Sequence, residues 1–347
     1  MAPNMQSTTS SAAASPAGGI TRPALLLVLF LALLAAGGCA AASGGNATDV
    51  PPGATSDDPD ARVIRFIIPH DLPLARTHVN GRHVGMFLLD TGSSITVVEK
   101  NVARRLGLQP VATGRVTGIG GTEQVDIAYI DSLRVDNFHV GRHRVAMVDL
   151  DALQSSARTP IAGILGINTL RPQPFTIDYT ARRILLHDPD EFEPPEDAVA
   201  VRLHEINRLP AIEAQVVRDD RRQSIWLLLD SGMNSHLALP YAAVRENLWM
   251  LTGNQNIHRQ AVGVGGAARN ITSQVPLLRG LGREWQDVPV QLELDAPDQR
   301  VRGRPVGRIG NGLLTQLRLT FDYADRTVWI EPANAPRLTP APAGAAR

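Results

Sequence analysis

The chain of 347 residues has a single cysteine, so no disulfide within the chain can stabilise its fold. Acidic and basic residues balance at 34 each, and the basic ones, nearly all arginine, are scattered along the sequence. Without a strong field of one sign, binding to nucleic acid or to acidic substrates is not predicted. The nine histidines show no metal-ligand spacing and there is no Gly-x-Ser-x-Gly elbow. We therefore predict no metal, no other cofactor and no serine hydrolase.

The chain's N-terminal apolar run is also too short to span a bilayer. It extends from Ala24 to Ala36, thirteen residues, whereas a spanning helix needs about 20. This length is typical of a signal-peptide core, and small residues lead from it into Cys39. The segment resembles a bacterial lipoprotein signal, in which the cysteine becomes the lipidated N-terminus. We therefore expect export to the cell envelope or periplasm, with a lipid on Cys39 as the only membrane contact. Plain secretory cleavage nearby is the alternative.

A short motif that occurs twice is the most informative feature of the sequence. One apolar run ends in Asp90-Thr91-Gly92, and a second, Leu227 to Leu229, ends in Asp230-Ser231-Gly232. An apolar strand that delivers Asp-(Thr/Ser)-Gly into a turn can hold a carboxylate at the floor of a cleft. The glycine lets a neighbouring loop approach closely, and the hydroxyl can brace the loop by hydrogen bonds.

The two motifs belong to longer repeats. Three further segments recur in the same order, 144 or 145 residues apart: Gly118–Gly121 with Gly263–Gly266, Gly163–Leu170 with Gly307–Leu314, and Phe175–Tyr179 with Leu319–Tyr323. Four landmarks in one order with nearly constant spacing indicate an internal duplication.

This pattern resembles the retropepsin-like aspartic proteases, in the bacterial form in which two such lobes share one chain as in pepsin. The resemblance covers about residues 63–332. It implies an all-β fold of two homologous β-barrel lobes with few short helices, arranged as a bilobal pseudo-dimer. It also implies the site residues: the catalytic pair Asp90 and Asp230; the loop supports Thr91, Gly92, Ser231 and Gly232; and the substrate-binding hairpins Gly118, Ile119, Gly120, Gly121 and Gly263, Val264, Gly265, Gly266.

The sequence departs from this family pattern at two places. Met233 follows Asp-Ser-Gly where alanine or serine is usual, and Arg308 stands at an apolar place in the second apolar-apolar-Gly segment. Simpler interpretations also exist, since each Asp-(Ser/Thr)-Gly and each glycine-rich hairpin can be an ordinary turn. A dinucleotide-binding pattern can be read in residues 263–268, but no helix is predicted after it.

Local patterns predict the elements around the motifs. Ala75–Val79, Asn80-Gly81 and Arg82–Leu89 read as strand, primed turn and strand, a hairpin that aims Asp90. A strand end and short helix are expected over Val97–Leu108, closed by Gly107. The second copy is expected as strands Ala211–Val217 and Ile225–Leu229 around a turn at Arg218–Arg222, then a helix over Pro240–Leu251.

We divide the chain into a signal (1–39), a flexible tether (40–62), lobe one (63–189), a linker (190–199), lobe two (200–332) and a disordered tail (333–347).

The functional hypothesis is an aspartic endopeptidase that acts as a monomer on peptide in extended conformation. Two carboxylates close together cannot both ionise cheaply, so one holds a proton while the other activates a water. Because the titration belongs to the pair, neither acid is given a fixed role. The alternative is a catalytically inactive envelope protein that holds extended peptide in the same cleft.

Overall fold

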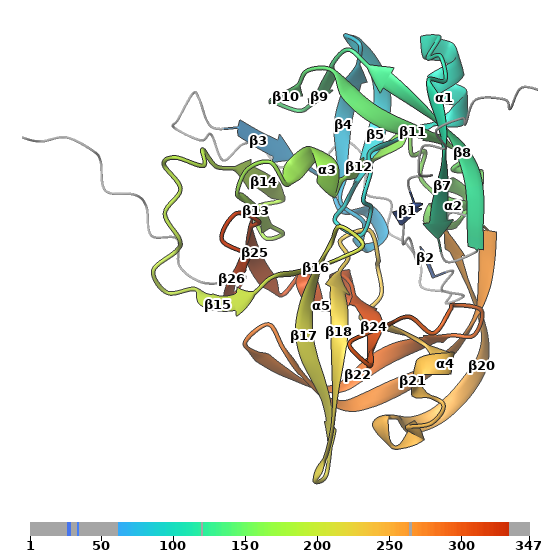
Figure 1. Cartoon of the computed structure of the whole chain (residues 1–347), viewed down its shortest axis with the longest axis vertical. Coiled ribbons are helices and arrows are strands. Elements are labelled where there is room, and N and C mark those ends of the chain that lie inside the picture. Colours follow the sequence, from blue (N-terminus) through green and yellow to red (C-terminus); the bar gives the residue numbers. More distant parts are fainter. Residues whose placement is uncertain (1–25, 29–32, 35–61, 119–120, 264–265, 333–347) are drawn as a thin grey trace, which may run out of the picture.

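The computed structural model describes residues 26–28, 33–34, 62–118, 121–263 and 266–332 (Figure 1). Cys39, the predicted tether up to residue 61 and the predicted tail lie outside these residues. So do Ile119, Gly120, Val264 and Gly265, which were predicted to form the tips of the two glycine-rich hairpins. No helix in the described part of the chain is long and apolar enough to cross a membrane.

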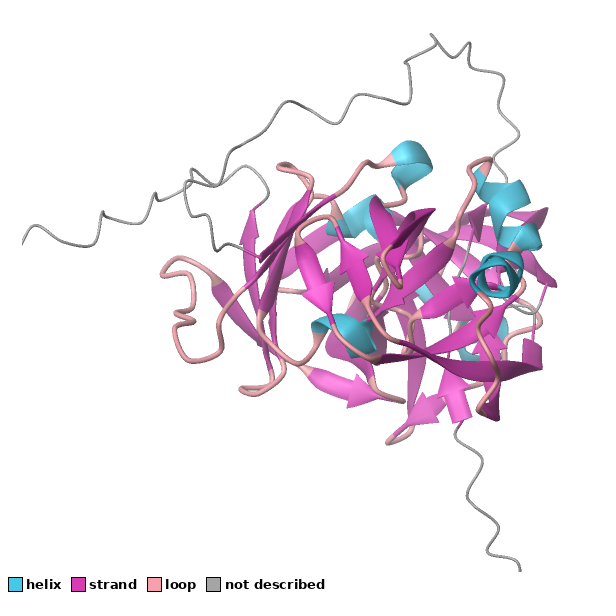
Figure 2. Cartoon of the chain, turned by 90° about the horizontal axis from the view of Figure 1, so that it is seen from above, coloured by secondary structure: helices cyan, strands magenta, loops and turns pink. Residues whose placement is uncertain are grey.

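Strands dominate the structure, and this confirms the prediction of an all-β fold (Figure 2). The first half of the chain forms a ten-stranded sheet, in the spatial order β1 (Leu26–Val28), β7 (Ala112–Gly118), β8 (Gly121–Ile130), β11 (His143–Val148), β6 (Val97–Glu99), β12 (Gly163–Gly166), β5 (Arg82–Asp90), β4 (Leu74–Val79), β9 (Leu133–Val135) and β10 (Phe138–Val140).

The second half, together with β2 from near the N-terminus, forms another sheet of the same size. Its order is β16 (His204–Ile206), β17 (Leu209–Arg218), β18 (Arg221–Leu229), β24 (Arg304–Ile309), β19 (Leu237–Pro240), β22 (Arg283–Glu293), β21 (Gly266–Gly280), β20 (Thr252–Gly263) and β2 (Leu33–Leu34), with β23 (Arg300–Val301) on β24.

The two large sheets repeat one topology. In each, a hairpin (β4–β5 or β17–β18) lies next to a strand parallel to its second member (β12 or β24). An antiparallel strand follows (β6 or β19), then a strand parallel to it (β11 or β22), and then a long antiparallel hairpin (β8–β7 or β21–β20). Equal order and equal directions over seven strands are what a duplicated sequence should fold into.

A third sheet joins the halves (Figure 1). Its order is β15 (Val199–Arg202), β26 (Thr327–Pro332), β25 (Leu317–Asp322), β13 (Phe175–Asp178), β14 (Arg183–Leu186) and β3 (Arg62–Arg65). At its centre β13 and β25, which are equivalent strands of the two repeats, pair antiparallel. Thr176 and Thr320 share a hydrogen bond of 2.7 Å between hydroxyls, and the rings of Phe175 and Phe321 stack at 4.8 Å. Because Thr176 faces its own equivalent, Thr320, and the flanking residues pair symmetrically about them, a local twofold axis passes between these two threonines.

The predicted hairpin before the first motif is confirmed. β4 and β5 are joined by Asn80 (φ 49°) and Gly81 (φ 74°), the left-handed pair that a primed turn requires. The helix after it is present as α1 (Lys100–Leu106). The Glu99 side chain caps its start by accepting from the Val102 N–H at 2.8 Å, and Gly107, at φ 70°, ends it.

Two element predictions for the second half are wrong. The helix expected over Pro240–Leu251 is only α4 (Tyr241–Val244) followed by a 3-10 turn, Leu248–Met250. Asn247 leaves the helical region at φ −129°, ψ 47°, and its side chain accepts from the Trp249 indole, a local bond that competes with the helix. The expected turn Arg218–Arg222 also shrinks to two residues, because Asp219 adopts φ 52° and closes the strands directly.

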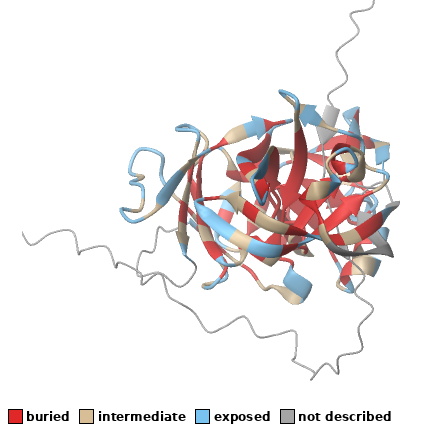
Figure 3. Cartoon of the chain, turned by 90° about the horizontal axis from the view of Figure 1, so that it is seen from below, coloured by how far each residue is buried: buried red, intermediate tan, exposed pale blue. Residues whose placement is uncertain are grey.

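The remaining elements are short. They are the 3-10 turn Pro69–Asp71 and the helices α2 (Asp151–Ala157), α3 (Ile167–Leu170) and α5 (Asn311–Leu314). Figure 3 shows the buried residues gathered in the strands and the exposed ones on the outer turns. One apolar cluster runs through both halves and the joining sheet, and a second, smaller one lies within the first half. Residues 187–198, which include most of the predicted linker, hold no helix or strand.

Two strands come from the apolar run near the N-terminus. β1 pairs parallel with β7 over Arg115–Thr117, and β2 pairs antiparallel with β20 at Ala261 and Val262. Each adds to the outer edge of a glycine-rich hairpin. These edges can therefore accept an extended segment by backbone hydrogen bonding.

Candidate active site

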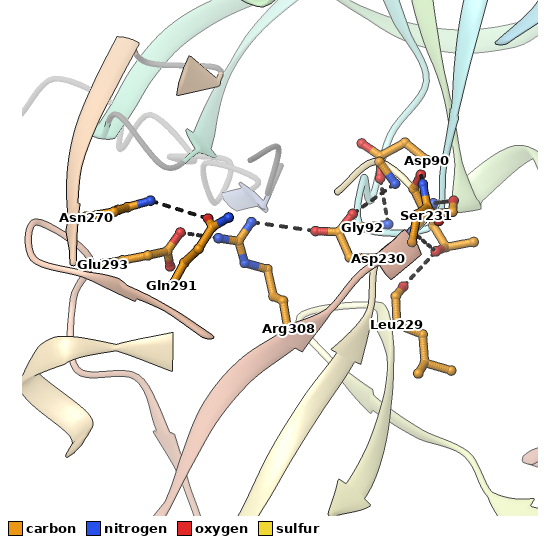
Figure 4. Close-up of polar contacts among 12 residues, drawn as sticks. Asp90, Gly92, Leu229, Asp230, Ser231, Asn270, Gln291, Glu293 and Arg308 are labelled. Carbon is orange, nitrogen blue, oxygen red and sulfur yellow. Dashed lines mark hydrogen bonds and ion pairs between the residues drawn. The ribbon is translucent and has the colours of Figure 1, made fainter. Parts of the chain in front are cut away.

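The two Asp-(Thr/Ser)-Gly turns meet at the interface of the halves and interlock through their hydroxyl residues. The Thr91 N–H donates to Ser231 Oγ at 3.0 Å, and the Ser231 N–H donates to Thr91 Oγ1 at 3.0 Å. Each hydroxyl then donates to the strand before the opposite turn, Thr91 to the Leu229 carbonyl (2.6 Å) and Ser231 to the Leu89 carbonyl (2.9 Å). Both side chains are buried, so these four reciprocal bonds clamp one turn to the other (Figure 4).

Each glycine of the motif makes room for the opposite carboxylate. A Cβ on Gly92 would lie 2.6 Å from Oδ1 of Asp230, and one on Gly232 would lie 2.5 Å from Oδ1 of Asp90. Contacts that short do not occur, so only glycine fits at either place. Each glycine N–H also donates to the aspartate of its own turn, at 2.8 Å to Asp90 and 3.0 Å to Asp230.

The two aspartates are thus brought together and removed from solvent, with no exposed surface on either. Burial, together with the negative charge of Asp230, raises the pKa of Asp90 well above its ordinary value of 3.8. Burial also raises the pKa of Asp230, but only to about 6, because the Arg308 cation opposes the rise. Among the described residues, Oδ2 of Asp90 and Oδ2 of Asp230 have no hydrogen-bond partner, although Oδ2 of Asp230 lies 3.5 Å from Nη1 of Arg308.

An apolar-apolar-Gly segment lies behind each turn. In the first half, Gly166 pairs with Asp90, and a Cβ there would lie 2.5 Å from the Ile95 backbone. In the second half the Ile309 carbonyl accepts from the Asp230 N–H at 3.0 Å, and a Cβ on Gly310 would meet the Met233 carbonyl at 2.5 Å. Close backbone packing therefore fixes both turns from behind.

Met233, the unusual residue after the second motif, belongs to this packing layer. Its side chain is fully buried, with Cε lying 2.7 Å from where a Gly310 Cβ would be. Its carbonyl accepts from the Asn311 N–H at 2.7 Å. Met233 therefore packs behind the Asp230 turn, against α5 and the strand before it.

Arg308 lies next to the candidate site. Its Nη1 forms an ion pair with Oδ2 of Asp230 at 3.5 Å, and its Nη2 binds Oε1 of Glu293 (Figure 4). The three side chains are at most 6% exposed. Asn270 and Gln291, also buried, form the outer end of this row. The sequence singled out Arg308 but not Glu293, Gln291 or Asn270. An alignment of the two repeats would have shown them, because their first-half counterparts are Val148, Ala146 and Val125.

Sequence reasoning also missed Asn311. Its side-chain amide donates to the Ser231 carbonyl at 2.8 Å and to the Asp71 carbonyl at 2.6 Å. The Tyr179 hydroxyl donates to the amide oxygen of Asn311 at 2.8 Å. Burial, and then the negative charge of Asp230, raises the pKa of Tyr179, so this phenol stays neutral and acts as a brace.

The structure describes the two glycine-rich hairpins only as far as their last paired residues. Gly118 pairs with Gly121, and Gly263 with Gly266. The predicted tip residues between them are outside the described part. In that described part no group of three or more His, Cys, Asp or Glu side chains could hold a metal ion. His143 instead shares hydrogen bonds with Thr169 (2.9 Å) and Asn168 (3.0 Å).

Comparison with known proteins points to the same chemistry. Residues 75–169 match the sequence model of a family described as aspartyl protease. The matched stretch contains Asp90-Thr91-Gly92 and the first apolar-apolar-Gly segment, Ile164 to Gly166. The match supports a relationship to retropepsin-like aspartyl proteases, and with it peptide hydrolysis as the family's activity. No curated protein matches the chain significantly.

Proposed function

We propose that the protein is an aspartic endopeptidase whose catalytic pair is Asp90 and Asp230. The observation that carries this proposal is reciprocal: each carboxylate rests on the glycine of the other's turn, and no other residue fits there. Where a turn requires glycine for its backbone angles, the glycine has a positive φ, but neither Gly92 nor Gly232 does. Both glycines therefore provide the space that the opposite carboxylate occupies. Because placing two buried carboxyl groups close together destabilises the fold, such an arrangement is expected mainly at a functional site.

In this proposal the two halves form a bilobal pseudo-dimer, with lobe one at 63–189, lobe two at 200–332 and a linker between them. The repeated strand order and the twofold pairing of β13 with β25 support this division. Since both acids come from one chain, we propose an active monomer. A lone retropepsin-like lobe supplies one aspartate and has to dimerise.

The proposed substrate is a peptide bound in extended conformation between the glycine-rich hairpins. The pairing of β1 with β7 and of β2 with β20 supports it, because both edges take up an added strand. We also propose that residues 1–39 are a signal that leaves the mature protein, with lipid on Cys39. Its removal would take β1 and β2 away and free both edges for substrate.

An assay on a diverse peptide library tests the proposal. The purified protein should cleave peptides, and Asp90→Asn should not. If wild type and Asp90→Asn bind the same peptides equally and neither cleaves them, the protein is an inactive peptide-binding member of this fold. The buried ion pair between Arg308 and Asp230 is the observation that favours this second candidate, because a carboxylate paired with a cation is a weaker base.

A further inference from the structure

The ion-paired row beside Asp230 replaces an apolar cluster that exists in the other half. Ile164 in β12 pairs with Leu88 on one side and Val97 on the other, and it is buried among apolar side chains. Arg308 in β24 occupies the same place, between Leu228 and Ala238. The two aspartates therefore have unlike surroundings although their turns are alike.

Burial makes this difference consequential. A buried guanidinium is costly unless anions face it, and Arg308 has two: Asp230 and Glu293. If Asp230 carried the proton of the pair, Arg308 would keep only Glu293. If Asp90 carries it, Arg308 keeps both anions. Among the described residues Asp90 itself forms no ion pair, and Arg308 is the last of the causes acting on its pKa.

We propose that Arg308, held in place by Glu293, is a positioning residue that fixes the negative charge of the pair on Asp230 and leaves the shared proton on Asp90. The inference rests on the proposed function and assigns a role to each acid. Asp230 is then the base, Asp90 the acid, and the site is chemically asymmetric despite its duplicated frame.

The reaction follows with every proton placed. A water oxygen bonds to the scissile carbonyl carbon as its proton passes to Asp230, while Asp90 gives its proton to the carbonyl oxygen. The neutral diol then collapses: the C–N bond breaks, Asp230 protonates the leaving nitrogen, and a diol hydroxyl returns a proton to Asp90. The products are a carboxylic acid and an amine, and both side chains return to their starting states.

The charged and titratable groups around Asp230 come from four elements. Asp90 at the end of β5 and Arg308 of β24 face its carboxyl group, Glu293 of β22 lies behind Arg308, and Tyr179 after β13 lies within reach of its charge. Burial raises the pKa of both acids, and Arg308 opposes that rise mainly at Asp230. Glu293 acts in the opposite direction by raising the pKa of Asp230.

Titration of the acids by carboxyl ¹³C NMR tests the inference without needing turnover. In full-length Asp90→Asn only Asp230 of the pair remains, and in Asp230→Asn only Asp90. We expect Asp230 to titrate at the lower pH, by about 1–3 units. Equal midpoints, or a lower midpoint for Asp90, would overturn the proposal.

Variants expected to shift the Asp230 midpoint in opposite directions show whether Arg308 is what lowers it. In the Asp90→Asn background, Arg308→Ile with Glu293→Val, which installs the first-half residues, should raise the midpoint of Asp230 to near that of Asp90. Glu293→Gln has nearly the same shape and should lower it, because Arg308 then faces Asp230 alone. Arg308→Lys keeps the cation and should preserve the order even if the double change does not fold. A midpoint that moves upward in Glu293→Gln contradicts the proposed role.

The pH profile of cleavage separates the two proposals. With both aspartates present, the acidic limb of kcat should move down in Glu293→Gln and up in Arg308→Ile/Glu293→Val, whereas a merely structural role would scale the rate at all pH values. If Asp230 titrates below Asp90 but the wild type cleaves no peptide, the proposed function is wrong and the role of Arg308 stands. If the wild type cleaves peptide but the two acids titrate at the same pH, the role of Arg308 is wrong and the proposed function stands.

Discussion

At the scale of single residues, the candidate site depends on two glycines as much as on two acids. Gly92 and Gly232 have ordinary backbone angles, so their requirement is space. The nearest atoms to an added Cβ belong to the opposite carboxyl group. A substitution at either glycine therefore tests whether that carboxyl group lies against the turn.

Gly92→Ala and Gly232→Ala should each push the opposite carboxylate away. We expect a loss of activity of roughly 100-fold or more and a destabilisation of about 1–3 kcal/mol, because a buried acid has to move by a large fraction of an ångström. Cleavage rates and urea unfolding measure the two effects. The matched control is Gly141→Ala, where nothing lies within 4 Å of the added Cβ. Full activity in both alanine variants would show that the carboxylates do not approach each other there.

The raised pKa of Asp90 predicts an unusual pH dependence of stability. Its folded pKa lies above the ordinary 3.8, so between these values the folded protein holds more protons than the unfolded chain. The contribution of Asp90 to stability should therefore be fully present below about pH 4 and be lost as the pH rises above that value, by at most about 1.4 kcal/mol per pH unit for one proton. Because Asp230, whose pKa is raised to about 6, acts in the same direction, Asp90→Asn should reduce this slope in urea unfolding, while Asp220→Asn at an exposed position should leave it unchanged. A wild type that gains stability over that pH range contradicts the assigned shift.

At the scale of elements, the sequence was most informative where the determining residues are adjacent. Asn80-Gly81 specifies its own turn, and the strand that follows aims Asp90. The helix expected over Pro240–Leu251 was wrong because the Asn247 side chain bonds locally to Trp249. The row from Asp230 to Asn270 was missed because its members are far apart in the sequence, in the turn after β18 and in β24, β22 and β21. They come together only in the folded sheet, where β24, β19, β22 and β21 follow one another.

The hairpin of β4 and β5 offers a test at this scale. Gly81→Ala forces a side chain into φ 74° with empty space around it, so the strain alone should cost about 1 kcal/mol. Urea unfolding measures it, with Gly141→Ala again as the control since its φ is not positive. A neutral Gly81→Ala would show that the turn is not of the primed type.

At the scale of the whole molecule, both the sequence and the strand topology show the duplication. The landmarks 144 or 145 residues apart become equal strand orders, and the equivalent strands β13 and β25 pair across a local twofold axis. The sequence shows an arginine at an apolar place of the second copy, but not that Arg308 is buried in an ion pair with Asp230, which makes the surroundings of the two acids unlike.

Export and anchoring are also properties of the whole molecule. We expect the wild type to enter the detergent phase on phase separation, and Cys39→Ser to remain in the aqueous phase with unchanged unfolding, because that residue would carry the only lipid. If wild type is found wholly in the aqueous phase, plain secretion replaces the proposed anchor.

The central claim is that Asp90 and Asp230 act as one catalytic unit, and a double-mutant cycle on peptide cleavage tests it most directly. Asp90→Asn and Asp230→Asn should each lower kcat by roughly three orders of magnitude or more, and the double variant should be hardly slower than either, because groups that act together are strongly non-additive. Should Asp230→Asn keep nearly wild-type turnover while Asp90→Asn loses it, the second acid would be structural and the account would be contradicted.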